Sequence, residues 1–384
     1  MNTVADTTLP NTPVAASAPA AAPDPAANAA LKAPSAAEVQ REREAFYGRA
    51  DTQSLAPLWT RLKSLVPKEP TPTCQPHHWR YADVRPYVLE SAQQISAAEA
   101  ERRVLILENP GLRGSSQVTN TLYAGLQLIM PGEVAPAHRH TQSALRFIVE
   151  GSGAYTAVDG EKTLMRPGDF VITPSWTWHH HGHEAQGPMV WLDGLDIPLV
   201  AFFNSTFRED HDQAQAPVER PVGDALARYG AGLLPVGWTP GSLNSPVFNY
   251  PYDRTREALQ ALTRAGAPDP HTGHLMRYIN PADGGWAMPT MATMIRLLPA
   301  GFATQPYRSS DSMVFIVVEG RGRFGVGGQC YEVVPHDVVV APGWVAHTLQ
   351  ADEDLVLFSY SDRVAQEKLG LWREQRLAAS GSSA

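Results

Sequence analysis

The sequence predicts a protein dominated by β-strands, in which N-terminal helices precede two copies of one double-sheet barrel. Two stretches, residues 103–204 and 286–365, consist of short runs of Val, Ile, Leu, Tyr and Phe separated by turn-forming pairs such as Pro-Gly and Asp-Gly. Such runs are typical of antiparallel strands joined by tight turns. The second stretch repeats the first, so the same fold is expected twice.

The internal repeat rests on two ungapped sequence matches. PAHRHTQSALRFIVEG at 136–151 aligns with QPYRSSDSMVFIVVEG at 305–320, an offset of 169 residues. RPGDFVITPSWTWHHH at 166–181 aligns with VPHDVVVAPGWVAHTL at 334–349, an offset of 168. Two unrelated β-rich segments would share apolar positions, but they would rarely keep Pro, Asp, Trp and His in one order. We therefore infer an internal repeat.

The flanking segments differ in character from the barrels. Residues 1–34 have too few large apolar groups to offset the entropy of ordering, so we expect them to be disordered. In the segment 35–102, Ser35 and Glu38 form a capping-box pattern at the start of a helix, and APLWTRLKSLV predicts a second helical piece. The other segments are a linker with one helix, in DRTREALQALTRAG, at 205–285 and a tail at 366–384.

Composition and charge exclude several classes of function. The formal net charge of −8 argues against nucleic acid as a partner, because phosphate binding needs clustered Lys and Arg. No apolar run is long enough to predict a membrane span, and the N-terminus with its early Asp6 does not resemble a secretory signal. Cys74 and Cys330 match no metal or redox spacing, which fits a reducing compartment. We therefore expect a cytoplasmic protein.

Three histidines of the first barrel form a candidate metal site. His138 and His140 lie two apart on a predicted strand and so point to one side, and His179 lies in a later strand of the same barrel. In a closed double-sheet roll such residues converge on the interior, where three neutral imidazoles can hold one divalent ion. Ligand type alone leaves Zn, Fe, Mn, Ni and Cu open. In the second barrel Tyr and Ser replace the first two histidines and only His347 is kept, so metal chemistry is expected in the first barrel alone.

Three neutral ligands leave the 2+ charge of the ion uncompensated and about three coordination positions open. This favours a chelating, dianionic substrate, as in ring-cleaving oxygenases. His181 follows His179 by two residues and so lies on the same side of the strand. It is a candidate hydrogen-bond partner or acid/base for a substrate, because the ordinary pKa of histidine lies near working pH. The alternative is a solvated residue at the rim.

The spacing of these residues resembles the two motifs of the cupin superfamily. The motifs are Gly132-x5-His138-x-His140 and Gly168-x5-Pro174-x4-His179. The acidic ligand that is usual in the superfamily falls on Ala144, so the resemblance implies a three-histidine site. Trp176 stands for the usual glycine and His183 for the usual closing asparagine, which indicates a subfamily.

Longer stretches resemble the gentisate 1,2-dioxygenases, bicupins that include salicylate and 1-hydroxy-2-naphthoate dioxygenases. The resemblance rests on YAGLQLIMPGEVAPAHRHTQSALRFIVEG, PSWTWHHHGH and WLDGLD, and spans about residues 40–370 with a degenerate second cupin. It implies an enzyme that uses Fe(II) and O2 to cleave an aromatic ring between the carboxyl-bearing and the adjacent hydroxyl-bearing carbon, giving maleylpyruvate from gentisate. It also implies a homo-oligomer, commonly a tetramer.

The resemblance assigns roles residue by residue. The positions that correspond to the iron ligands are His138, His140 and His179. Arg146, on the same strand face as His140, corresponds to an arginine that pairs with the substrate carboxylate or stabilises an anionic oxygen; a salt-bridged structural arginine is the alternative. Arg102 corresponds to a second arginine that contacts the carboxylate, although Arg103 beside it could take that place.

The remaining pocket positions concern the substrate ring. Gln127 and Asp193 correspond to residues that contact the ring hydroxyls, and Tyr123 and Gly125 flank the same wall; ordinary roles at the edge of the core are the alternative. The family member that cleaves salicylate has Trp at the position of Tyr123, so Tyr123 favours gentisate, while Gly125 leaves salicylate open. A non-catalytic bicupin that binds a small aromatic acid is the alternative from a different class.

Overall fold

The computed structural model of the chain describes residues 34–378. The chain divides into two units, one ending at Pro67 and one beginning at Lys68. The disorder expected for residues 1–34 concerns a segment that lies, except for its last residue, outside the described residues. Within 34–378, no helix is long and apolar enough to cross a membrane.

The N-terminal unit consists of short helices. Helix α1 (Ala36–Asp51) begins with the predicted capping box: the amide of Glu38 donates to Ser35 Oγ at 3.3 Å, and the amide of Ser35 donates to the Glu38 carboxylate at 2.7 Å. This helix start is therefore confirmed. The second predicted piece is divided into a 3-10 turn, η2 (Leu58–Thr60), and a single α-turn, α2 (Leu62–Leu65).

Two antiparallel sheets form the first barrel. The six-stranded sheet has the order β12-β8-β5-β10-β3-β2, and the five-stranded sheet has the order β11-β4-β9-β6-β7. Two of the edge strands, β11 and β12, come from the segment 205–285, which therefore pairs with the barrel as well as connecting it. The bounds are β2 (Val104–Ile106), β3 (Tyr123–Ile129), β4 (Val134–His140), β5 (Ala144–Glu150), β6 (Ala154–Val158), β7 (Glu161–Leu164), β8 (Phe170–Thr173), β9 (His179–His183), β10 (Met189–Leu195), β11 (Arg208–Asp210) and β12 (Asn249–Tyr250).

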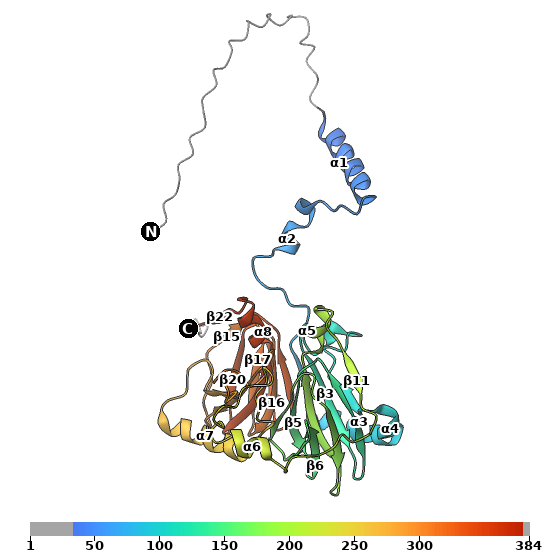
Figure 1. The fold of residues 1–384 in the computed structure, drawn as a ribbon. Coiled ribbons are helices and arrows are strands. Elements are labelled where there is room, and N and C mark those ends of the chain that lie inside the picture. The colour runs from blue at the N-terminus through green and yellow to red at the C-terminus, as the bar shows by residue number, and fades with distance from the viewer. Residues whose placement is uncertain (1–33, 379–384) are drawn as a thin grey trace, which may run out of the picture. The chain divides into compact units, whose positions relative to one another are not determined.

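The second barrel has the same design, and Figure 1 shows the two barrels side by side. Its sheets have the orders β1-β19-β16-β21-β14-β13 and β18-β17-β20-β15-β22. Edge strands again come from outside the repeated stretch. The bounds are β1 (His77–Trp79), β13 (His274–Arg277), β14 (Ala292–Leu298), β15 (Tyr307–Ser309), β16 (Met313–Glu319), β17 (Gly322–Val326), β18 (Gln329–Val333), β19 (Val338–Ala341), β20 (His347–Ala351), β21 (Leu355–Ser361) and β22 (Glu374–Arg376).

The six-stranded sheets are buried on both faces. On β5, Arg146 points into the first barrel, while Phe147 points the other way and stacks on Phe358 of β21 with ring centroids 4.5 Å apart. The hydroxyl of Tyr360 on β21 donates to the carbonyl of Tyr123 at 2.8 Å. Alternation along each strand thus divides its side chains between a barrel interior and a core shared by both barrels. For this reason these strands have near-continuous apolar sequences.

A helix before the first barrel connects it to the second. Helix α3 (Tyr81–Gln94) begins where the amide of Tyr81 donates to the carboxylate of Asp337, at 2.8 Å, in the second barrel. One turn later Arg85 pairs with Glu150 of the first barrel at 2.8 Å. The helix therefore makes polar contacts with both barrels.

Helix α7 (Tyr252–Ala265), which the sequence predicts, repeats this arrangement in reverse. The amide of Tyr252 donates to Asp169 of the first barrel at 2.9 Å, and Arg256 pairs with Glu319 of the second at 2.9 Å. The Asp and Glu that recur in both halves of the sequence are therefore anchors for two equivalent helices. The internal repeat extends beyond the two matched segments, which the sequence did not reveal.

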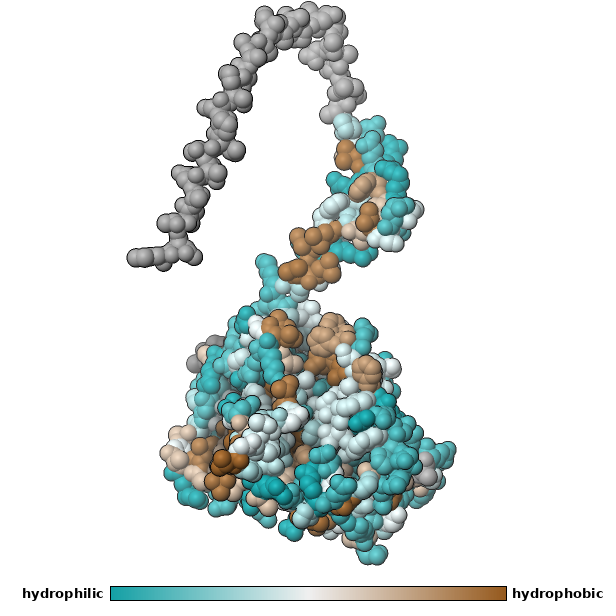
Figure 2. Space-filling model, viewed as in Figure 1, coloured by the Kyte–Doolittle hydropathy of each residue, from teal (hydrophilic) through white to brown (hydrophobic). Residues whose placement is uncertain are grey.

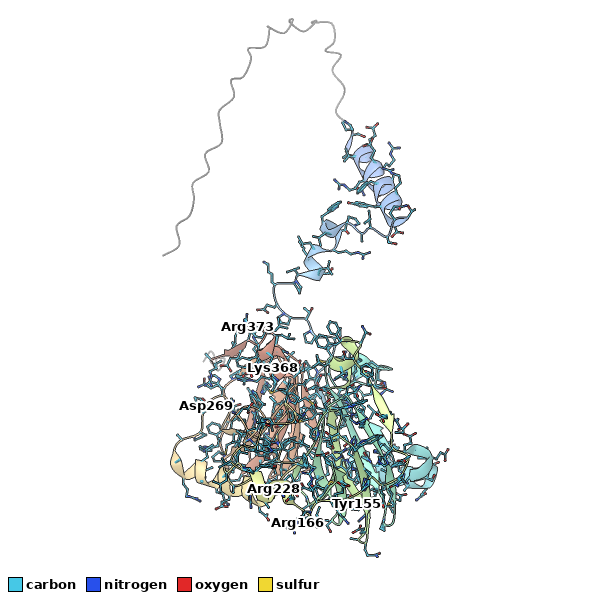
Figure 3. All side chains as sticks on the ribbon, viewed as in Figure 1. Tyr155, Arg166, Arg228, Asp269, Lys368 and Arg373 are labelled. Carbon is cyan, nitrogen blue, oxygen red and sulfur yellow. The ribbon has the colours of Figure 1, made fainter. Side chains whose placement is uncertain are left out.

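The remaining helices are short. They are α4 (Ala97–Ala100), η3 (Pro110–Leu112), α5 (Ile197–Phe202), α6 (Asp224–Tyr229) and α8 (Arg363–Lys368). Figure 3 shows Lys368 and Arg373 at one end of the two-barrel unit and Arg166, Arg228 and Tyr155 at the other. The described chain thus contains more strand than helix, arranged as two double-sheet barrels, and the predicted fold class is confirmed.

Candidate active site

The three predicted histidines meet inside the first barrel. His138 lies opposite His179 in the pairing of β4 with β9, and His140 follows on the same face of β4. One ring nitrogen from each histidine lies within 4.8 Å of the others. Among residues 34–378 these side chains form the one group of three His, Cys, Asp or Glu close enough to share a metal ion.

Backbone carbonyls orient two of the imidazoles. Nδ1 of His140 lies 2.9 Å from the carbonyl of Gln142, and Nδ1 of His179 lies 2.9 Å from the carbonyl of Thr177. Because a carbonyl only accepts, both Nδ1 atoms carry the proton. Each Nε2 therefore presents a lone pair, as a metal ligand requires.

The environment keeps the imidazoles neutral. Burial, with Arg102 nearby, lowers the pKa of His138 to about 2, and burial lowers the pKa of His140 to about 4. The pKa of His179 is also well below its usual value, mainly through burial. Ala144, at the usual acidic position, lines the same cavity and supplies no carboxylate. The site thus fits a divalent metal held by three neutral ligands.

A cavity of about 290 Å³ opens on this group. Of the other residues expected at the site, five line it and two do not: His181 and Gly125 lie behind the wall. Its lining is Arg102, Val104, Tyr123, Gln127, His138, His140, Gln142, Ala144, Arg146, His179, Asp193, Leu195, Ile197, Thr206 and Arg208. A larger cavity, about 520 Å³, lies around Trp176 and Trp178 and contains none of the three histidines.

Arg146 is almost fully buried and is held by three neighbours. Its Nη1 donates to Thr173 Oγ1 at 2.5 Å, its Nη2 lies 3.1 Å from His181 Nε2, and its Nε lies 3.5 Å from Asp193 Oδ1. The Nε itself has no hydrogen-bond partner among the described residues. A guanidinium held in this way is fixed in orientation.

The hydrogen bonds of His181 define its tautomer. Because Arg146 can only donate, Nε2 of His181 accepts and carries no proton. Nδ1 then donates to Thr156 Oγ1 at 2.9 Å. Burial, followed by the charge of Arg146, lowers the pKa of His181 well below its usual value. His181 is a neutral residue behind Arg146, so this geometry favours a positioning role over the predicted acid/base role.

Asp193 lies opposite Arg146 in the pairing of β10 with β5. Its Oδ1 accepts from Trp191 Nε1 at 2.9 Å. Burial raises the pKa of Asp193 to about 6, although Arg146 and the Trp191 hydrogen bond act in the opposite direction. The carboxylate is therefore close to titration near neutral pH.

Arg102 and its neighbour Arg103 lie in different surroundings. Arg102 lines the cavity, donates to the carbonyl of Pro136 at 2.7 Å, and has its Nη2 3.3 Å from His138 Nε2. Arg103 points away and pairs with Glu133 at 2.5 Å. The structure therefore brings the first arginine, and not the second, to the metal ligands.

Gly125 affects the shape of the cavity wall because it has no side chain. A Cβ added there would lie 2.4 Å from Val104 Cγ1 and 2.9 Å from the Tyr123 hydroxyl. Both of these side chains line the cavity, as does Gln127 on the same face of β3. A glycine at 125 thus lets Val104 and Tyr123 occupy their positions.

Sequence reasoning missed Arg208. This residue lies on β11, opposite His140, and lines the cavity. Its Nη2 pairs with Glu101 at 2.5 Å and with Asp210 at 2.6 Å. No signal in the sequence places it there, because its strand is short and falls in the segment expected to be a linker.

Trp176 explains why the superfamily usually has glycine at its position. Its φ is +58°, in the left-handed region that favours glycine. Its amide donates to the carbonyl of His140 at 2.7 Å, and its ring lies 4.7 Å from the Arg139 guanidinium. Trp344, the equivalent residue of the second barrel, has φ +64° and lies 4.4 Å from Arg308. The strained turn is therefore common to both barrels and independent of the metal site.

Comparison with known proteins identifies relatives of the chain. Residues 125–195 match the family model of the cupin domain. The chain is 53% identical over 338 residues to gentisate 1,2 dioxygenase 1 of Aquipseudomonas alcaligenes, which covers 88% of this chain and 97% of that protein. It is 36% identical to 5-aminosalicylate 1,2-dioxygenase of Comamonas sp, covering 89% of this chain and 92% of that protein.

A solved structure extends the comparison to the fold. Salicylate 1,2-dioxygenase from Pseudoaminobacter salicylatoxidans, in its adducts with gentisate, aligns with a TM-score of 0.83 at 33% identity, covering 87% of this chain and 94% of that one. Sequence similarity and fold similarity thus extend over nearly the whole length of these relatives. The chain belongs to the gentisate 1,2-dioxygenase family.

Proposed function

We propose that this chain is an Fe(II)-dependent dioxygenase that opens gentisate between its carboxyl-bearing and adjacent hydroxyl-bearing carbons to give maleylpyruvate. Both atoms of one O2 enter the product, so the balance is one gentisate and one O2 per maleylpyruvate. The observation that carries the proposal is a single cavity lined by three neutral imidazoles and by three arginines, Arg102, Arg146 and Arg208. Relatives named for the same reaction support it.

Iron is proposed because the donor set fits it and because the family resemblance implies it. His138, His140 and His179 would hold the ion through nitrogens that carry no proton. When bound, Fe(II) supplies open coordination positions and the redox chemistry that O2 requires. Ligand type does not distinguish iron from zinc or manganese, so metal analysis forms part of the test.

The remaining residues bind and orient the substrate in this proposal. Arg146 and Arg102 line the cavity and match the carboxylate in charge. Gln127 and Asp193, which line the same cavity, would hydrogen-bond the ring hydroxyls, and Tyr123 would form the wall beside them. Holding the reacting groups in one geometry lowers the entropic part of the barrier.

The direct test is reconstitution with Fe(II) in the absence of oxygen, followed by addition of gentisate and O2. We expect equal consumption of both and a product that absorbs in the near ultraviolet. Absence of turnover with gentisate, salicylate and 1-hydroxy-2-naphthoate alike would refute the proposal. A bicupin that only binds an aromatic acid would instead show binding without O2 uptake.

Salicylate remains the second candidate substrate because the cavity wall retains Gly125. The salicylate 1,2-dioxygenase of similar fold was solved in adducts with gentisate, so one family member binds more than one ring. Comparing kcat/KM for gentisate and salicylate decides between them. We expect gentisate to be preferred, since its second hydroxyl makes the ring richer in electrons.

We also propose that the protein is a cytoplasmic homotetramer with no nucleic-acid or membrane partner. Large apolar side chains on the two-barrel unit support self-association: Phe202, Phe203 and Phe207 are 78%, 55% and 63% exposed. Figure 2 shows hydrophobic surface at the end of this unit where α5 lies. Light scattering should give about four times the chain mass of 41.7 kDa.

A further inference from the structure

The interior of the second barrel contains a buried charge. Arg296 lies on β14 and is 2% exposed. Its Nε is buried and has no hydrogen-bond partner, and within residues 34–378 no ion pair is formed by its guanidinium. An ionised group removed from water without a partner is strongly destabilising, so a buried arginine normally has a counter-charge.

Other polar groups around Arg296 are also unpaired. The Nε2 atom of His347 on β20 and the Oγ atom of Ser359 on β21 are buried without hydrogen-bond partners among the described residues. The guanidinium carbon of Arg296 lies 5.1 Å from the ring centroid of Phe315, and Phe315 pairs directly with Ser359. The imidazole of His347 lies 5.6 Å from the same ring. Three unpaired polar groups thus surround one aromatic ring.

The first barrel shows what has changed at these positions. The repeat places Arg296 on Gln127 and His347 on His179. The strand pairings place Ser359 on Asp193, because Asp193 pairs with Arg146 as Ser359 pairs with the equivalent Phe315. The second barrel has therefore lost the carboxylate of its counterpart, and its guanidinium stands at the position of Gln127, while Phe315 replaces Arg146.

The interiors of the two barrels therefore contain different sets of charged groups. The first barrel offers neutral imidazoles, the carboxylate of Asp193 and the guanidinium of Arg146, so its buried arginine has a carboxylate 3.5 Å away. The second replaces two ligand positions with Tyr307 and Ser309 and places a fixed positive charge in the interior. No carboxylate of residues 34–378 pairs with this guanidinium, so an anionic ligand would supply the counter-charge that Asp193 supplies in the first barrel.

We propose that the interior of the second barrel is a binding site for a small monovalent anion, held by Arg296. The Nε–H of Arg296 and the hydroxyl of Ser359 are available as donors. His347 is not a donor to the anion, because its other ring nitrogen donates to the carbonyl of Val345 and Nε2 therefore carries no proton. The anion supplies the missing counter-charge and stabilises the barrel by binding only the folded state. The site is separate from the proposed dioxygenase centre and does not depend on it.

The test uses bromide as the probe on the full-length chain. Sodium gluconate is replaced stepwise by sodium bromide at constant ionic strength, and the melting temperature is followed. We expect a saturable rise of about 2 °C or more for the wild type. Arg296→Gln, which installs the residue of the first barrel, should show no saturable rise. Equal responses of the two proteins, or none in the wild type, would overturn the proposal.

A second measurement covers the case in which Arg296→Gln fails to fold. Crystals of the wild type are soaked in bromide, and anomalous scattering locates the ion. A peak within hydrogen-bond reach of Arg296 supports the site, and a well-ordered barrel interior without one refutes it. Sodium formate in the same titration shows whether a small carboxylate can replace the halide.

Discussion

Nη2 of Arg146 lies 3.1 Å from Nε2 of His181, and the imidazole accepts this hydrogen bond. Arg146, which lines the cavity, is therefore oriented by a neutral histidine that lies behind it. A positioning role for His181 follows, since both of its ring nitrogens are already engaged.

The first prediction tests this role. His181→Leu removes the acceptor and should lower kcat/KM for gentisate by about 10- to 100-fold, because Arg146 loses its orientation. His181→Gln keeps an acceptor and should recover part of the loss. Metal content should remain that of the wild type in both. A loss of metal, or unchanged kinetics, would contradict the positioning role.

The second prediction concerns the metal and has a control within the chain. His179→Gln should abolish stoichiometric metal binding and activity, because two imidazoles cannot hold the ion. His347→Gln changes the equivalent residue of the second barrel and should retain about one metal ion per chain. Elemental analysis of both variants after reconstitution makes the comparison. Loss of metal in His347→Gln would show that the second barrel also holds an ion, and it would contradict the prediction.

The third prediction follows from the pKa of Asp193, which is about 6. Below this pH the group is protonated and a negative charge disappears beside Arg146 and Arg102. Suppose that an anionic ligand raises the pKa of Asp193 by one unit. By linkage, it must then bind about tenfold more tightly at low pH, where Asp193 is protonated, than at high pH, where Asp193 is ionised. We expect the Kd of a non-reactive benzoate analogue to fall between pH 7 and pH 5. Asp193→Asn should have a flat profile over this range, and a wild-type affinity that rises with pH would contradict the assignment.

The fourth prediction concerns the wall at Gly125. Gly125→Ala places a Cβ 2.4 Å from Val104 Cγ1, so Val104 or Tyr123 must move towards the cavity. We expect KM for gentisate to rise by about tenfold while metal content is unchanged, since a displacement of this size disturbs substrate orientation. The double variant with Val104→Ala relieves the contact and should restore KM. If KM stays at the wild-type value in the single variant, the wall is more flexible than the packing indicates.

The fifth prediction separates backbone strain from side-chain contact at Trp176. Trp176→Gly and Trp176→Ala both lose the stack on Arg139, but only glycine relieves the left-handed backbone. The alanine variant should therefore be less stable than the glycine variant by about 1 kcal/mol in urea unfolding. The same pair of substitutions at Trp344 should give the same sign, because its φ is similar. A glycine variant that is the less stable of the two would show that strain is absent.

Much of the site could be predicted because its residues lie on regular strands. Alternation with a period of two places His138 and His140 on one face, and the same rule brings Arg146 to the interior. Asp193 was predicted from the family resemblance. Local hydrogen bonding also shows in the sequence, as in the Ser35–Glu38 capping box. These features depend on near neighbours along the chain, and periodicity and residue type are enough to reveal them.

Arg208, the division of roles between Arg102 and Arg103, and the paired helices α3 and α7 were not predictable in this way. Each depends on a pairing between residues that are distant in the chain, such as Arg208 with Glu101 or Tyr81 with Asp337. The sequence by itself determined two barrels, a histidine triad in the first and its loss in the second. Only the tertiary structure decided which neighbours face that triad and that Arg296 is buried without a counter-charge, because burial and partnership are properties of the packed chain and not of any segment of it.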